Sequence, residues 1–177
     1  MKVLQNDSMF VTVSKHEKKL KVEKNAWERE LFHRESIEKV FDNWKVLLPS
    51  GASLRLWFNS GNDGGERVTV NIYTRTPNAK FSDYFGSFCL TLAGEISGDN
   101  FIIYSSGMRI EEKYRDKGYS YVLHAMKEEI AKTHGIDIMV ARVQADNLVA
   151  AKSMKRTRWR KVWLTNRGTD VWMKEIK

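Results

Sequence analysis

The hydrophobic positions of this chain change period along its length, and each period predicts a different kind of element. Residues 9–13 alternate as in a short strand, and the basic stretch 15–24 either continues that strand or forms a solvated arm. From Asn25, which with Glu28 resembles a capping pair, apolar residues recur at helical spacing. This spacing predicts one long helix or two short ones that end before Pro49.

Four segments in the middle of the chain predict strands. They are rich in β-branched and aromatic residues, and turn-forming residues such as those at 97–100 separate them. Because each segment follows the previous one through a turn, we expect an antiparallel meander. The predicted strands are residues 53–58, 67–74, 85–93 and 101–110.

The helical period returns after residue 118, and Gly135 ends the predicted helix. The next segment, residues 136–143, is apolar at nearly every position, which is typical of a strand buried on both faces. A strand, a helix and a buried strand in this order predict a parallel pair joined by a right-handed crossover. The apolar face of the helix consists of Tyr119, Val122, Leu123, Met126 and Ile130.

The last segment predicts a helix over residues 147–156 and a hairpin whose strands, 161–165 and 170–173, flank a glycine-containing turn. The expected order of elements is therefore β, α, four β, α, β, α, β, β. This order predicts an α/β protein of the α+β type, with a mixed, mostly antiparallel sheet around one parallel pair. The length of 177 residues and the 42% hydrophobic content predict a single domain over residues 1–177.

Composition limits the cellular compartment and the kinds of ligand that fit this chain. Cys89 is the only cysteine, so no intrachain disulfide can form, and a reducing, cytoplasmic location fits best. The apolar patches in the first 15 residues are far shorter than a membrane-spanning helix, so we expect no membrane partner. The net charge of +8 favours anionic ligands over cationic ones.

Residues 108–120 carry the strongest chemical signal. This segment ends a predicted strand, forms a short basic loop and opens a helix. The first turn of a helix has unpaired backbone N–H groups and the positive end of the dipole, which suits a pyrophosphate. Gly118 permits close approach of the backbone, and Arg115 and Lys117 add positive charge.

This loop resembles the acyl-CoA motif of the GNAT superfamily of N-acetyltransferases, Arg/Gln-x-x-Gly-x-Gly/Ala, which reads Arg115, Gly118 and Ser120 here. The resemblance extends over roughly residues 101–163. It implies acetyl-CoA as acyl donor, a central parallel strand pair splayed to bind acyl-CoA, and helices on both faces of the sheet. The cofactor-binding residues that it implies are Met108, Arg109, Ile110, Arg115, Lys117, Gly118, Tyr119 and Ser120.

A second family signature, an asparagine after the fifth strand with an alanine three residues later, resembles Asn147 and Ala150. Asn147 would contact the cofactor, or it is simply a helix N-cap, or it serves both roles. The tyrosine that usually protonates the departing thiolate is replaced by Met154, and the following glycine-aromatic pair by Arg158 and Trp159. A methionine thioether has no proton to give, so another group must supply it or transfer is lost.

Acyl transfer to an amine also needs a base. The candidates are Glu95, Glu111, Glu112 and His124. Glu111, next to the pantetheine-binding strand that the resemblance implies, is the best placed. His124 falls on the polar face of its predicted helix, so we expect it to be exposed. We predict no metal site.

Between residues 152 and 161 there are six cations and no acidic residue, with Trp159 among them and Trp163 just beyond. The cluster is a candidate for binding nucleic acid, tRNA or DNA, through phosphates and an exposed indole. The alternatives are a solvated face beside core tryptophans, or a grip on the 3′-phosphate of CoA. The six cations are Lys152, Lys155, Arg156, Arg158, Arg160 and Lys161.

These observations lead to two functional hypotheses. The first is an N-acetyltransferase that transfers an acetyl group from acetyl-CoA to an amine of an anionic or neutral acceptor, since the positive charge disfavours polyamines and basic tails. The second is an inactive GNAT-fold module that binds nucleic acid or a protein partner through its basic C-terminal third. The oligomeric state, monomer or dimer, stays open.

Overall fold

A computed structural model of the chain describes residues 32–60, 66–75, 82–96 and 100–176. The predicted strand at 9–13, the basic stretch 15–24 and the start of the first predicted helix lie outside the described residues. No helix in the described ranges is both long and apolar enough to cross a membrane.

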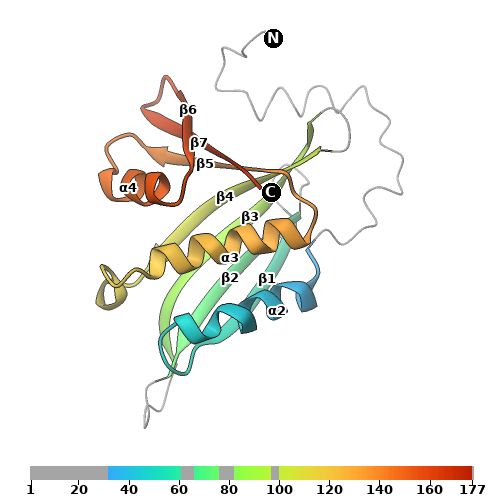
Figure 1. Ribbon diagram of the computed structural model, residues 1–177, viewed down its shortest axis with the longest axis vertical. Helices are drawn as coiled ribbons and strands as arrows, with labels where there is room; N and C mark the ends of the chain where they lie inside the picture. Colours follow the sequence, from blue (N-terminus) through green and yellow to red (C-terminus); the bar gives the residue numbers. More distant parts are fainter. Residues whose placement is uncertain (1–31, 61–65, 76–81, 97–99, 177) are drawn as a thin grey trace.

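A seven-stranded sheet organises the chain, in the order β1-β2-β3-β4-β5-β7-β6 (Figure 1). Neighbouring strands are antiparallel except β4 and β5, which are parallel, as predicted. The strands are β1 (Ser53–Ser60), β2 (Glu66–Thr74), β3 (Asp83–Ile96), β4 (Asn100–Ile110), β5 (Ile138–Gln144), β6 (Arg160–Leu164) and β7 (Thr169–Glu175). The helices are α2 (Arg34–Trp44), α3 (Tyr119–Thr133) and α4 (Leu148–Arg156), with the 3₁₀ turns η2 (Lys45–Leu47) and η3 (Glu112–Tyr114).

The described helices pack on one face of the sheet, whereas we expected helices on both faces. Helices α2, α3 and α4 all contribute to one core cluster with strand residues such as Met139 and Trp172. The opposite face carries a separate small cluster of Ile102, Val140 and Val171, with no helical residue. Both crossovers, β4–α3–β5 and β5–α4–β6, step in the same direction across the sheet. Because such crossovers are right-handed, they place both helices on the same side.

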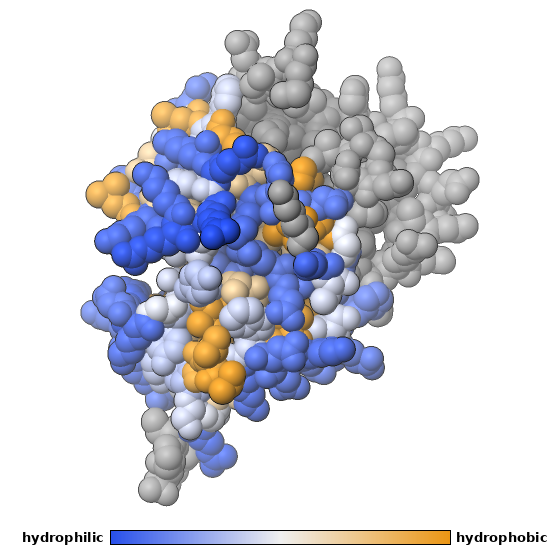
Figure 2. Space-filling model, viewed as in Figure 1, coloured by the Kyte–Doolittle hydropathy of each residue, from blue (hydrophilic) through white to orange (hydrophobic). Residues whose placement is uncertain are grey.

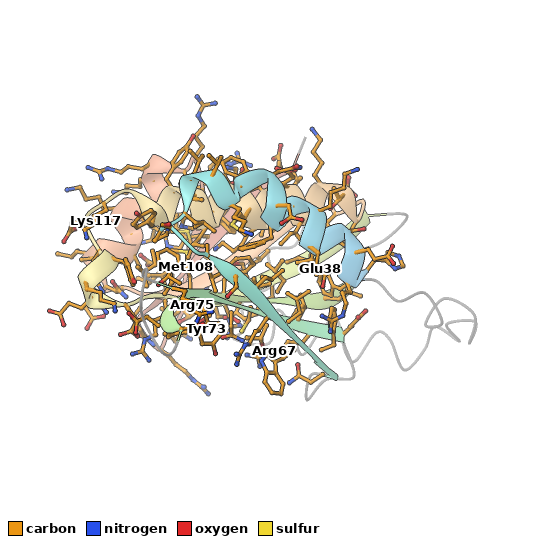
Figure 3. The ribbon with its side chains drawn as sticks, turned by 90° about the horizontal axis from the view of Figure 1, so that it is seen from below. Glu38, Arg67, Tyr73, Arg75, Met108 and Lys117 are labelled. Atoms are coloured by element: carbon orange, nitrogen blue, oxygen red, sulfur yellow. The ribbon has the colours of Figure 1, made fainter. Side chains whose placement is uncertain are left out.

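Alternation along the strands separates an apolar face from a polar one. In β2, Val68, Val70 and Ile72 are fully buried, and the residues between them are only half-buried. Figure 3 shows Arg67 and Tyr73 of β2 on the side of the sheet away from α2 and α3. Most of the buried side chains belong to the cluster on the helix-covered face. Because each fully buried aliphatic side chain stabilises the fold by roughly 1.5–3 kcal/mol, this face contributes most of the core's stability.

The parallel strands β4 and β5 separate after a short shared ladder. They pair from Ile102 opposite Ile138 to Ser105 opposite Ala141, and β4 then runs on to Ile110 without β5 as a neighbour. Gly107, with φ of 59°, lies where the β3–β4 register shifts, which bends β4. Figure 1 shows the two strands diverging beyond the ladder. We call this opening the fork and the Ser105–Ala141 pair its apex.

Candidate active site at the fork

The loop between β4 and α3 is anchored to the sheet by aromatic packing. The ring of Tyr114 contacts Phe85 edge-on, with 5.1 Å between ring centroids, and its hydroxyl shares a hydrogen bond of 2.8 Å with Thr74. Tyr119 packs against the same phenylalanine at 5.2 Å. The start of α3 is therefore held at a fixed place beside the end of β4.

The two cations of the loop fold back onto its backbone. Arg115 donates from Nε to the carbonyl of Ile110 at 2.9 Å, and Lys117 donates from Nζ to the carbonyl of Lys113 at 2.9 Å. Both side chains are exposed. Figure 3 shows Lys117 at the end of the molecule where α3 begins. The arginine uses only Nε in this contact, which leaves its terminal nitrogens as donors for a ligand.

The first turn of α3 is uncapped. Gly118 occupies the N-cap position with φ of 82°, no side chain caps the turn, and the turn contains no acidic residue. A Cβ added at Gly118 would meet nothing within 4 Å, so the backbone is open to solvent. Tyr119 and Ser120 follow it, half-buried. The loop thus combines unpaired N–H groups with positive charge, which is an arrangement that binds anions.

The end of β4 forms one side of the fork. Met108 and Ile110 pack against the core and are half-buried, and Figure 3 shows Met108 on the helix-covered side of the sheet. Arg109 is exposed and forms an ion pair of 2.9 Å with Glu111. A Cβ at Gly86 would lie 2.5 Å from the carbonyl oxygen of Arg109, so glycine is what lets β3 pack closely here.

Asn147 caps α4. Its side-chain oxygen accepts a hydrogen bond of 3.0 Å from the backbone N–H of Ala150, so the N-cap interpretation is confirmed. Its contact with a cofactor stays a prediction. Met154, the residue in place of the usual tyrosine, is buried in the core cluster, where its thioether can pack but cannot donate a proton.

The candidate bases differ in their surroundings. Glu111 forms an ion pair with Arg109, and Glu112 is exposed. The side chain of Glu95 lies outside the described residues. The predicted exposure of His124 is wrong, because its side chain is 1% exposed and packs edge-on against Trp159 at 6.1 Å.

Burial changes the chemistry of His124. It lowers the pKa of the imidazole to about 2, with further lowering by Lys127 and Lys174, so the ring stays neutral near pH 7. Neither ring nitrogen has a hydrogen-bond partner in the described part of the chain. Trp159, which covers this face of α3, follows α4 in the sequence. The hydrophobic period of α3 alone therefore could not predict that His124 is buried.

Lys127 is a second buried titratable group, and its burial was not predicted from the sequence. It is 1% exposed, and its Nζ donates a hydrogen bond of 3.0 Å to Oγ of Ser105. Burial lowers its pKa to about 7; Glu128 opposes this shift and Lys174 adds to it. The signal was available, since Lys127 is four residues after Leu123 and three before Ile130, on the apolar face of the predicted helix.

The basic C-terminal cluster lies on α4, the following turn and β6. Figure 2 shows hydrophilic side chains gathered over this part of the molecule, with apolar residues at its border. Arg160 is paired with Glu175 at 2.9 Å, and Lys161 with Asp170 at 2.6 Å. The other four cations, Lys152, Lys155, Arg156 and Arg158, are exposed.

The two tryptophans of this region have different environments. Trp159 is 3% exposed and belongs to the core, which decides between the two readings of that residue. Trp163 is 37% exposed on the edge strand β6. Only Trp163 is therefore accessible for stacking against a base.

Comparison with known proteins gives a likeness in structure only. No family model matches the chain, and no curated protein matches it. Arabidopsis thaliana NAA60, solved in complex with a bisubstrate analogue, is similar with a TM-score of 0.50 and 18% identity, over 82% of this chain and 96% of that chain. A putative acyl-CoA N-acyltransferase from Klebsiella pneumoniae is similar with a TM-score of 0.50 and 12% identity, over 85% and 92% of the two chains.

The GNAT domain of S. lividans PAT has a TM-score of 0.51 and 12% identity, over 62% of this chain and 60% of that one. The match therefore spans less than two thirds of the S. lividans chain. All three identities are low, so the likeness establishes architecture rather than activity. On this likeness, and with β4 and β5 parallel and then diverging beside the start of α3, the chain has the fold of the GNAT acetyltransferases.

Proposed function

We propose that the protein is an acyltransferase that uses acetyl-CoA and acetylates an amine. The observation that carries this proposal is the position of the uncapped, basic start of α3 at the end of the loop that follows β4, the strand that leaves its parallel neighbour at the fork. A pyrophosphate at Gly118 would receive backbone N–H groups and the charges of Arg115 and Lys117. The pantetheine arm would then follow β4 at Met108–Ile110 toward the apex.

The likeness to NAA60 supports acetyl-CoA as the donor, since that protein was solved with acetyl-CoA bound. In this proposal Glu111 remains the candidate base, and its ion pair with Arg109 would have to open for it to accept a proton. The net charge of +8 favours an acceptor amine on an anionic or neutral molecule.

Calorimetric titration with acetyl-CoA tests the cofactor site. We expect the wild-type protein to bind and Gly118→Glu to bind at least about tenfold more weakly, or about 1.4 kcal/mol, because the new carboxylate repels the pyrophosphate. The absence of binding to the wild type would contradict the proposal.

Gly135 offers a matched control on the same helix. It has φ of 68° and, like Gly118, no atom within 4 Å of an added Cβ, but it lies beyond the opposite end of α3. Gly135→Glu introduces the same side chain under similar backbone strain, so it should leave acetyl-CoA affinity unchanged. Equal weakening in both variants would show that strain, rather than repulsion at the phosphate site, explains the loss.

A second candidate function is nucleic-acid binding by the C-terminal region. Residues 144–170 contain seven Lys and Arg and two Asp, which gives +5 of the chain's net +8. The exposed Trp163 lies on the strand that follows four exposed cations. Such a surface suits phosphates with a stacked base.

Fluorescence anisotropy with a single-stranded RNA oligonucleotide tests this candidate. Lys155→Glu combined with Arg156→Glu should weaken binding and reduce its salt dependence, whereas Lys39→Glu on α2 should change neither much. If the wild type does not bind RNA at low salt, the second candidate is wrong.

A further inference from the structure

The lysine buried under α3 lies at the apex of the fork. Nζ of Lys127 is bonded to the hydroxyl of Ser105, the last residue of β4 that pairs with β5. Beyond this residue the two strands separate. An acyl chain that ran between them from the start of α3 would therefore end beside this amine.

The surroundings of this amine are polar but incompletely paired. An ammonium has three donors, and in the described residues Nζ has one hydrogen-bond partner. It lies 5.8 Å from the centroid of the Trp159 ring. The indole nitrogen of Trp159 and both ring nitrogens of His124, whose ring packs 6.1 Å from the Trp159 ring, also lack partners among the described residues. Buried polar groups normally find partners, so this cluster is suited to receive a polar group from a ligand.

We propose that Lys127 is an internal acceptor, a lysine that is acetylated by the acetyl-CoA bound in the fork. This inference rests on the proposed function, because it needs the acyl donor at that site. Lys127 would be the modification site, and the reagent that modifies it would be a thioester.

The transfer balances without a further reagent. The lone pair of Nζ attacks the thioester carbonyl carbon, the carbon–sulfur bond breaks, and an amide bond forms. The proton that the nitrogen loses goes to the departing thiolate, which leaves as CoA. The buried amine becomes a neutral amide, which removes a charge that is unfavourable in the core.

The electrostatics of the site favour the nucleophilic form. Because burial lowers the pKa of Lys127 to about 7, much of the amine is unprotonated near neutral pH. The charged groups that face it are Glu128 on the same helix and Lys174 on β7, which are paired with each other at 2.5 Å. His124, one turn earlier on α3, stays neutral.

Mass spectrometry after incubation with acetyl-CoA tests the inference. We expect the peptide that contains Lys127 to be acetylated at least about tenfold faster than that of the exposed Lys132 on the same helix. The rate should rise with pH and level off above about pH 7, where the amine is neutral. Gly118→Glu should slow the modification about tenfold, in step with its loss of cofactor affinity.

Two further measurements keep the outcomes separate. Excess CoA competes for the cofactor site, so it should suppress modification of Lys127 in the wild type and leave Lys132 unaffected. If acetyl-CoA binds by calorimetry but Lys127 is modified no faster than Lys132, or equally with excess CoA, the inference is wrong and the proposed function stands. If acetyl-CoA does not bind, the proposed function fails and takes this inference with it.

Discussion

The two ends of helix α3 contrast sharply, although each carries a glycine in the left-handed region. At the C-terminal end, Gly135 donates to the carbonyl of Lys132 and Ile136 donates to that of Ala131, a Schellman motif that satisfies the last carbonyls. Ile136 is buried against the core. At the N-terminal end, Gly118 provides no side-chain cap, and the exposed cations Arg115 and Lys117 precede the turn.

The difference indicates which end is structural and which is available to a ligand. A helix end closed by its own backbone and by an apolar contact contributes to stability and has no free polar group to offer. An end with unpaired N–H groups and positive charge gives up that stability and gains affinity for anions. Changes at the C-terminal end should therefore alter unfolding, and changes at the N-terminal end should alter binding.

The largest expected effect is at the capped end. Ile136→Ala should lower the free energy of unfolding by about 2–5 kcal/mol, because it removes a buried side chain that anchors the Schellman motif. Acetyl-CoA affinity of the folded variant should not change. Urea unfolding and calorimetry measure the two quantities, and a loss of affinity with unchanged stability would reverse the comparison.

The middle of the helix belongs to neither end and should respond to pH. The pKa of Lys127 is about 7 in the folded protein and about 10.4 when unfolded, so the unfolded state binds more protons between these values. Stability should therefore rise as the pH increases from about 7 to about 10. Lys127→Met should abolish this contribution and stabilise the protein by about 1–4 kcal/mol at pH 7. Urea midpoints of the wild type and of Lys127→Met at pH 7 and pH 9 test this prediction. If the midpoint changed equally between the two pH values in both proteins, the prediction would be wrong.

The smallest effect compares the two glycines directly. Gly118→Ala and Gly135→Ala should each cost about 1–2 kcal/mol, because alanine is strained at these positive φ angles. Only Gly118→Ala should also weaken acetyl-CoA binding, since its methyl group projects at the turn where the pyrophosphate is proposed to lie. Thermal unfolding measures the stability of the two variants, and calorimetry measures their affinity for acetyl-CoA. If both variants bound acetyl-CoA equally well, the pyrophosphate would not lie at Gly118.

Much of the fold was predictable because the sequence pattern is local. The predicted strands at 53–58, 67–74 and 101–110 and the helix stopped by Gly135 agree with the structure to within a few residues. The parallel pair followed from the order of strand, helix and apolar strand. The basic loop at Arg115 was also visible, since its charge and glycine need no tertiary contact to be recognised.

The elements, their order, the parallel pair and the basic loop before α3 follow from backbone preferences and spacing along the chain, so the sequence alone was enough to predict them. Packing in the folded chain fixes which face the helices share, buries His124 and Lys127, and pairs Arg160 and Lys161 with acidic residues. These features are not settled by the sequence pattern alone, because the environment of a side chain depends on which distant residues pack against it. For His124 and Lys127 that neighbour is Trp159, which comes from beyond the next strand and helix.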